Sequence, residues 1–200
     1  NPDSEKDNSQ TVQYAGNEEP ELYEILSKQA REVAGVGAIK GAIIPHHLVG
    51  GYIPATLFNY LGKQNPSLVV IFGPNHFNKG GAKVITSVSD WETPFGRIKS
   101  ERDAALKLAE SGTAKIDEDV FKTEHSISAL VPFIAKSLPK TKILPIIFPY
   151  YTDTTTLNNL LDKLAPLLPA DVVIVSSIDF SHYQNQAVAE FHDELNRAVI

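Results

Sequence analysis

Several histidines in the sequence follow runs of Ile and Val, at points where the chain turns. His46 and His47 end one such run, His76 ends a second, and His182 follows a third. Neutral imidazole is the commonest metal ligand in proteins, and it titrates near neutral pH. A single histidine at the end of a strand more often bonds a loop carbonyl. Three such loops at the same edge of one sheet favour a functional site.

His46 and His76 are the leading candidates for metal ligands. Two histidines from adjacent strands plus one anionic group would make the facial site that non-haem Fe(II) uses, with positions left for substrate and oxygen. Hydrolytic zinc sites use a similar set. Because His47 directly follows His46, its side chain should point elsewhere in an extended segment, so we expect His47 either to support a metal ligand from behind or to line the pocket.

Other polar residues in these segments have two interpretations each. Asp179 and His182 form a D-x-x-H pair, the arrangement of a general base, although Asp179 alone could cap a helix. His125 stands at a helix start and is either a site residue or structural. Asn75 either binds an anion or shapes its turn. We take His192, in the middle of a helical segment, as structural.

The histidines are positioned by a pattern of alternating strands and helices. We expect strands over residues 41–44, 68–72, 83–87, 142–148 and 172–176, a turn over 91–96, and helices over 21–33, 55–62, 101–110, 127–138, 156–168 and 187–200. Pro132 should kink its helix or open the second half of it. Buried Ile- and Val-rich strands predict a three-layer α/β fold, with a mostly parallel central sheet and helices on both faces. Ligands of such sheets bind beyond the carboxyl ends of the strands.

Composition narrows the class of protein. The 200 residues, 42% of them hydrophobic, suffice for a single core. The net charge of -6 argues against nucleic acid as a partner, and no apolar stretch is long enough for a membrane span. Residues 1–20 read as a flexible acidic tail. Residues 21–200 read as one domain that lacks its C-terminal part, because the last helix shows no C-cap signal.

Five short motifs, in this order, resemble those of one known family. They are Pro45-His46-His47 with Gly51-Tyr52, Gly73-Pro74-Asn75-His76, Thr93-Pro94-Phe95-Gly96, Glu124-His125-Ser126-Ile127 and Ser176-Ser177-Ile178-Asp179-Phe180-Ser181-His182-Tyr183. The family is Memo, called AmmeMemoRadiSam system protein B in prokaryotes, and it shares its fold with class III extradiol dioxygenases. The resemblance runs from about Lys40 to the end.

The resemblance implies a metal site with His46 and His76 as ligands and iron or copper as the ion. It also implies catalytic or pocket roles for His182, His125 and Asp179. The family's third ligand is a cysteine in a further C-terminal segment. The sequence has no cysteine, so the metal site should be incomplete. We assign substrate binding to three residues of these motifs: His47, Asn75 and Tyr183.

The sequence also departs from the family pattern. His47 stands in place of an alanine, three residues replace one before the glycine pair, Ser128 replaces a glutamate, and the segment before Lys40 lacks the family's usual opening. An altered or lost metal site is therefore an alternative.

Two main functions follow from these residues, with zinc-type hydrolysis as a third. One is a metal-dependent oxidoreductase with Fe(II), or else copper or zinc. The other is a non-catalytic module that binds a small molecule or peptide in the same pocket, with or without a metal. The family name implies a functional link to AMMECR-type and radical SAM proteins. It also implies a cytoplasmic location, whereas the absence of Cys and Met and the acidic N-terminus would suit export.

Overall fold

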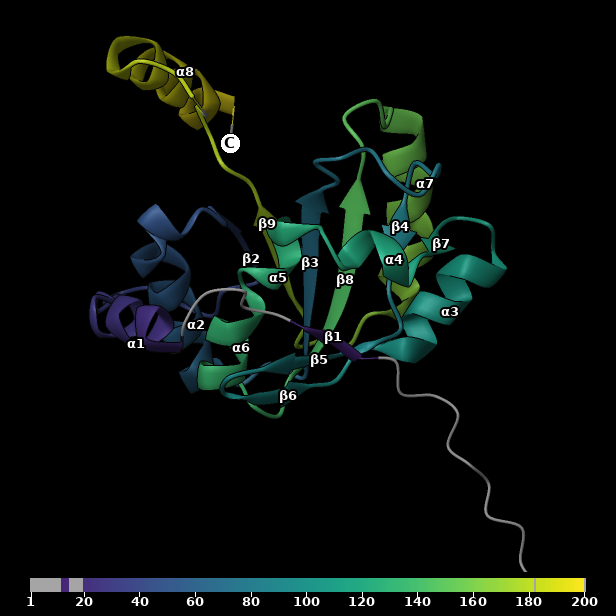
Figure 1. Ribbon diagram of the computed structural model, residues 1–200, viewed down its shortest axis with the longest axis horizontal. Coiled ribbons are helices and arrows are strands. Elements are labelled where there is room, and N and C mark those ends of the chain that lie inside the picture. The colour runs from purple at the N-terminus through teal and green to yellow at the C-terminus, as the bar shows by residue number, and fades with distance from the viewer. Residues whose placement is uncertain (1–11, 15–19, 182, 200) are drawn as a thin grey trace, which may run out of the picture.

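A six-stranded sheet forms the centre of the molecule (Figure 1). The computed structural model describes residues 12–14, 20–181 and 183–199. The strand order is β2 (Gly41–Ile44), β9 (Val173–Ser177), β3 (Leu68–Pro74), β8 (Lys142–Phe148), β4 (Ile85–Thr86) and β7 (Lys115–Ile116). All neighbouring pairs are parallel except β4 and β8. The predicted mostly parallel α/β sheet is thus confirmed.

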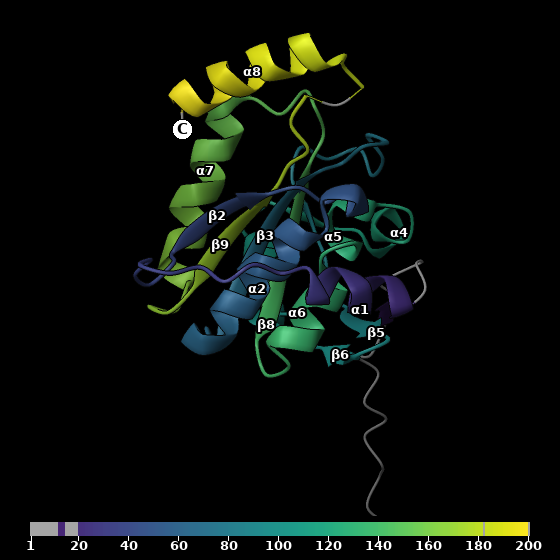
Figure 2. The ribbon, with the colours of Figure 1, turned by 90° about the vertical axis from the view of Figure 1, so that its left-hand side faces the viewer.

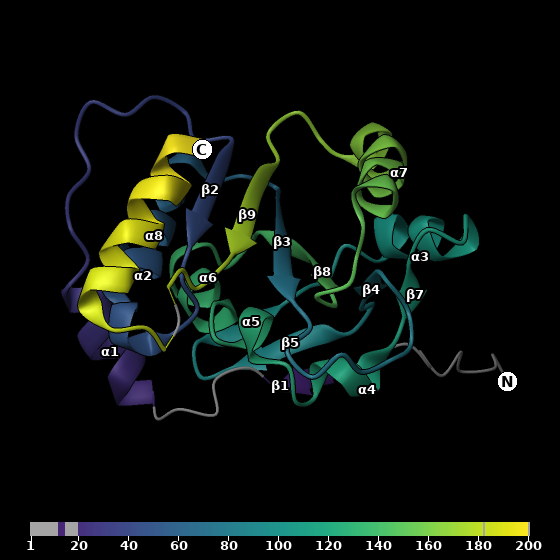
Figure 3. The same ribbon diagram turned by 90° about the horizontal axis from the view of Figure 1, so that it is seen from above.

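Helices cover both faces of this sheet, which gives the predicted layers (Figure 3). One face packs against α1 (Pro20–Lys28), α2 (Tyr52–Gln64) and α6 (Val131–Ser137). The other packs against α3 (Arg102–Glu110) and α7 (Thr154–Leu164). Alternate residues of β3 enter the two cores, Val69 and Ile71 on one side and Leu68 and Val70 on the other. This alternation explains why the strand is apolar throughout.

A smaller sheet lies beside the first face. It has the order β1 (Val12–Tyr14), β5 (Asp90–Thr93) and β6 (Gly96–Ile98). β5 and β6 form a hairpin around the turn that the sequence predicted, and β1 pairs with β5 in parallel. The side chain of Gln13 is buried and donates to Glu118. Val12–Tyr14 therefore departs from the expected tail, because its backbone completes a sheet edge. Residues 1–11 and 15–19 lie outside the described residues.

Most other elements match the expected segments. Pro132 lies in the first turn of α6, and a separate one-turn helix, α5 (His125–Ser128), precedes it, so the predicted break is confirmed. The predicted strand over 83–87 shortens to β4, and α1 ends at Lys28 rather than near residue 33. Short elements complete the chain: α4 (Glu118–Phe121) and two 3-10 turns, Leu48–Gly50 and Ala165–Leu167.

The last helix, α8 (Gln186–Val199), lies beyond the carboxyl ends of the strands and apart from the two helical layers (Figures 1 and 2). No described residue of α8 is buried. Within the described part of the chain, no helix is both long enough and apolar enough to cross a membrane.

One expectation about strand order was wrong. β9 lies between β2 and β3, so His46 and His76 do not follow neighbouring strands. The two histidines still lie close together, with ring centroids 5.1 Å apart.

Candidate metal site

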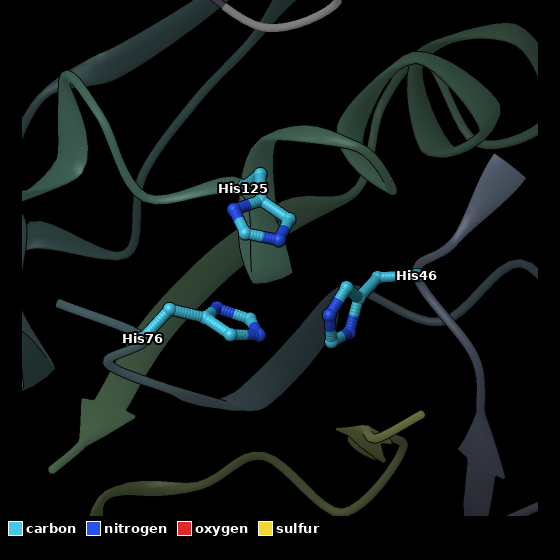
Figure 4. Close-up of side chains that lie close together, drawn as sticks. All are labelled: His46, His76 and His125. Carbon is cyan, nitrogen blue, oxygen red and sulfur yellow. The ribbon is translucent and has the colours of Figure 1, made fainter. Parts of the chain in front are cut away.

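Three histidines meet at the carboxyl edge of the central sheet (Figure 4). His46 follows β2, His76 follows β3, and His125 is the first residue of α5. Each offers one nitrogen, and these three atoms lie within 4.8 Å of one another. The rings of His76 and His125 stack with centroids 4.1 Å apart, and the His46 ring lies 5.1 Å from His76 and 5.5 Å from His125. We call these three residues the histidine cluster.

The tautomer of His46 is set by a chain of two hydrogen bonds. The hydroxyl of Ser177, at the end of β9, donates to the backbone carbonyl of Ser126 at 2.5 Å. The hydroxyl oxygen of Ser177 also lies 3.0 Å from Nδ1 of His46. Because its one proton is already used, Ser177 can only accept there, so Nδ1 of His46 carries the proton. The lone pair of His46 is therefore on Nε2, the nitrogen available to a metal.

Nε2 of His46 is a buried polar atom without a hydrogen-bond partner among the described residues. An unpaired buried polar atom costs free energy, and native proteins keep few of them. Burial is the main cause that lowers the pKa of His46 to about 4, and His76 and His125 lower it further, against the opposing effect of Asp179. His46 is thus neutral at pH 7, which is the form of imidazole that binds metals.

The tautomer of His76 is set by the buried carboxylate of Glu124. Oε1 of Glu124 lies 2.8 Å from Nδ1 of His76, and Oε2 accepts from the His76 backbone N–H at 2.8 Å. Burial opposes the charge on Glu124, but hydrogen bonds from Ser126 and His76 outweigh it and lower the pKa of Glu124. The ionised carboxylate can only accept, so Nδ1 of His76 donates and Nε2 is left for a ligand. In metal sites, carboxylates that accept a hydrogen bond from a metal-bound histidine fix its tautomer in the same way.

Asp179 holds the loop that carries His46. Its Oδ1 accepts from the backbone N–H groups of His46 and His47 at 2.9 and 3.2 Å, and its Oδ2 lies 3.4 Å from Nε2 of His46. The alternative role as a helix cap is wrong, because Asn185 accepts from Val188 in the first turn of α8. Asp179 therefore places a carboxylate at the rim of the histidine cluster.

The other predicted site residues lie around the cluster or outside it. His47 is exposed, and its Nδ1 accepts from Val49 at 3.3 Å. Asn75 is buried and bonds both backbone groups of Lys79, which is the turn-shaping interpretation. Tyr183 is 92% exposed. Substrate binding by these three residues stays a prediction. His182 lies outside the described residues, and His192 is exposed on α8 and not part of the cluster.

The sequence did not indicate the full set of residues at this site. His125 was weighed as a catalytic or structural residue, and the site was expected to be incomplete; the structure instead brings His125 within reach of the other two as a third nitrogen. Glu124 and Ser177 belong to two of the sequence motifs, but neither was assigned a role at the site. Two features of the sequence could have indicated them: Glu124 is a carboxylate directly before His125, and Ser177 is a hydroxyl at the end of an apolar strand. The three imidazoles, with two fixed tautomers and one unpaired buried nitrogen, fit a metal ion.

Taken together, the parallel sheet and the imidazoles at its carboxyl edge define an α/β protein with a candidate metal site. The sequence matches the family described as Memo-like protein over residues 8–199, and the chain belongs to this family. The match begins earlier in the chain than the resemblance from Lys40 had implied.

Archaeal members of the family are similar to this chain. It is 31% identical to a MEMO1 family protein of Pyrobaculum aerophilum over 80% of this chain and 59% of that protein. It is 32% identical to one of Thermococcus onnurineus over 85% of this chain and 62% of that protein, and 30% identical to one of Nitrosopumilus maritimus over 87% and 67%. The chain thus spans about three fifths of the length of the first two relatives.

Proposed function

We propose that this protein binds one transition-metal ion through His46, His76 and His125, and that it uses the ion in redox chemistry. The observation that carries the proposal is the buried Nε2 of His46, which has no hydrogen-bond partner among the described residues and belongs to a ring that lies beside the two other imidazoles. Three imidazole nitrogens without a thiolate suit iron, copper or zinc. Fe(II) is the ion we propose, with copper and zinc as the alternatives.

Two of the three imidazoles already have the tautomer that metal binding needs. Ser177 and Glu124 accept hydrogen bonds from Nδ1 of His46 and of His76, so the lone pair that can bind a metal is on Nε2 of each ring. Three protein ligands leave coordination positions for water or a substrate. Bound iron or copper would supply electron transfer and polarise a bound molecule. Asp179, beside His46, would offset part of the added positive charge.

Elemental mass spectrometry of the purified protein tests metal binding. We expect about one metal ion per chain, lost in a variant that combines His46→Ala with His76→Ala, and reduced in His125→Ala. His192→Ala is the matched control, because this histidine is exposed on α8 and outside the cluster. A chain that stays metal-free after anaerobic loading with Fe(II) would refute the proposal.

Oxygen consumption separates the redox protein from the non-catalytic module. The iron-loaded protein should consume O₂ in the presence of an oxidisable small molecule, and the double histidine variant should not. Bound metal without any turnover would leave a module that binds a ligand or partner in the same pocket. The link to AMMECR-type and radical SAM proteins stays a prediction from the family name.

A further inference from the structure

A cavity of about 570 Å³ opens beside the histidine cluster, between α7 and the end of the sheet. His46 and His76 form part of its wall, as do Ser176 and Asp179. The rest of the wall is apolar: Phe72, Gly73, Pro74, Phe148, Leu157, Leu160, Leu161 and Ile178. We call this cavity the apolar pocket. Its volume is in the range of small-molecule sites, about 300–1,000 Å³.

We propose that the apolar pocket binds a small amphipathic molecule. Its oxygen-donor head would lie at His46 and His76, and its hydrocarbon part would lie between α7 and β3–β8. The position of the head rests on the proposed metal site, whereas the position of the hydrocarbon part does not.

Part of the apolar wall of the pocket is made of side chains that the fold leaves partly exposed. Leu160 of α7 is 1% exposed and belongs to the core, but Leu161 beside it is 47% exposed. Phe72 of β3 and Phe148 of β8 are half-buried, and their rings lie 5.6 Å apart. Half-exposed rings at the ends of two central strands leave apolar surface in water, and an apolar ligand would remove that surface from it.

Three of the four polar residues of the wall, His46, His76 and Asp179, lie close together, which argues for a ligand with one polar end and one apolar end. His46 and Asp179 approach to 3.4 Å, and the rings of His46 and His76 lie 5.1 Å apart. The unpartnered Nε2 of His46 belongs to this polar group of residues. A purely apolar segment of protein would offer that nitrogen no hydrogen-bond partner, at a cost in free energy. A small molecule with a metal-ligating head would interact with the polar groups at one end of the pocket, and its hydrocarbon part would fill the apolar end.

Calorimetric titration with two hydroxamic acids of different length tests the proposal. Acetohydroxamic acid carries the metal-ligating head alone, and octanohydroxamic acid adds six methylene groups. Each methylene group that enters an apolar pocket strengthens binding by about threefold to fourfold. On the metal-loaded protein we therefore expect octanohydroxamic acid to bind at least roughly 100-fold more tightly than acetohydroxamic acid. Equal affinities would overturn the proposal.

A pair of leucine variants places the hydrocarbon part. Leu161→Asn should lower the affinity for octanohydroxamic acid by about tenfold and leave that for acetohydroxamic acid unchanged. Leu106→Asn on α3 is the matched control, because Leu106 is 44% exposed and outside the pocket, so both variants should fold. If both variants lowered the affinity for octanohydroxamic acid equally, the hydrocarbon part of the ligand would bind outside the apolar pocket and the proposal would fail.

A titration with 1-octanol keeps the pocket testable should the metal site fail. If the native protein stays metal-free after anaerobic loading with Fe(II), the proposed function is refuted, but 1-octanol should still bind and should bind more weakly to Leu161→Asn than to Leu106→Asn. Metal bound in full with no effect of chain length would refute the pocket alone. Absence of octanol binding to a metal-free chain would refute both.

Discussion

At the scale of single residues, the tautomers of His46 and His76 are fixed by hydrogen bonds to two different kinds of acceptor. His46 donates to a hydroxyl whose own proton goes to a backbone carbonyl, whereas His76 donates to an ionised carboxylate. A charged acceptor makes the stronger hydrogen bond and raises the basicity of the opposite nitrogen. His76 should therefore be a better electron donor to a metal than His46. Glu124 should likewise contribute more to metal affinity than Ser177.

The variant Glu124→Gln tests this difference. The amide keeps the shape of the side chain but loses the charge and one acceptor, so the metal dissociation constant should rise about 10-fold to 100-fold. Competition with a chelating dye measures it. Glu92→Gln is the control, since Glu92 pairs with Arg97 at the surface of the small sheet. An unchanged affinity in Glu124→Gln would show that the carboxylate does not support His76.

The burial of His46 also predicts how stability depends on pH. Its pKa is about 4 in the folded protein, below the ordinary value of 6.5. Between these values the unfolded chain binds the proton and the folded chain does not, so protonation favours the unfolded chain. The contribution of neutral His46 to the free energy of unfolding is therefore fully present above pH 6.5 and is lost as the pH falls toward 4. In protein stripped of metal, the loss should be at most about 3 kcal/mol.

Urea unfolding at several pH values measures this dependence. The same series on His46→Asn, which cannot take up that proton, should show a shallower decline between pH 6.5 and 4. Parallel curves for the two proteins would mean that His46 is not the group responsible.

At the scale of elements, the site depends on the contact between β3 and the one-turn helix α5. Ser126 of α5 donates through its hydroxyl to the carbonyl of Pro74 at 2.9 Å, and its backbone carbonyl accepts from Ser177. Gly73 allows this approach, because a Cβ at that position would lie 2.6 Å from Oγ and 2.9 Å from Cβ of Ser126. Such a short helix has little stability of its own, so tertiary contacts hold His125 in place.

Gly73→Ala should push α5 away from the sheet. We expect a loss of stability of about 1–3 kcal/mol, typical of overpacking, together with weaker metal binding. Thermal unfolding and the chelator competition measure the two effects. Gly37→Ala is the control, because a Cβ there meets no atom within 4 Å. If Gly73→Ala bound metal as tightly as the native protein, the β3–α5 contact would not position the site.

At the scale of the whole molecule, stability is unevenly distributed. The two cores lie on either side of β3 and β8, whereas no described residue of α8 is buried, and Phe191, Leu195 and Val199 are exposed. The second face is also open near β2, where Ile43 is 39% exposed and Phe180 42%. Elements with few buried contacts contribute little to global unfolding.

Removal of residues 186–200 should therefore leave the free energy of unfolding within about 1 kcal/mol of the native value, with the metal content unchanged. Leu160→Ala, in the core beneath α7, should by contrast cost about 2–5 kcal/mol. Urea unfolding compares the three proteins. A large loss of stability on truncation would show that α8 packs against the domain more closely than its exposure indicates.

The sequence by itself determined the local elements and the edge of the sheet at which the chemistry would lie. Apolar runs such as Leu68–Phe72, the helical spacing after His125 and the break at Pro132 depend on neighbouring residues, so they can be read along the chain. His46 and His76 could be predicted at one edge because parallel strands end on the same side.

Only the tertiary structure decided which side chains meet. The insertion of β9 between β2 and β3 brings Ser177 against His46, and the docking of α5 on Gly73 brings Glu124 to His76 and His125 into the cluster. The strand formed by Val12–Tyr14 likewise depends on β5, far away in the sequence. Strand order and long-range hydrogen bonds follow from the free energy of packing the whole chain, which local pattern does not contain.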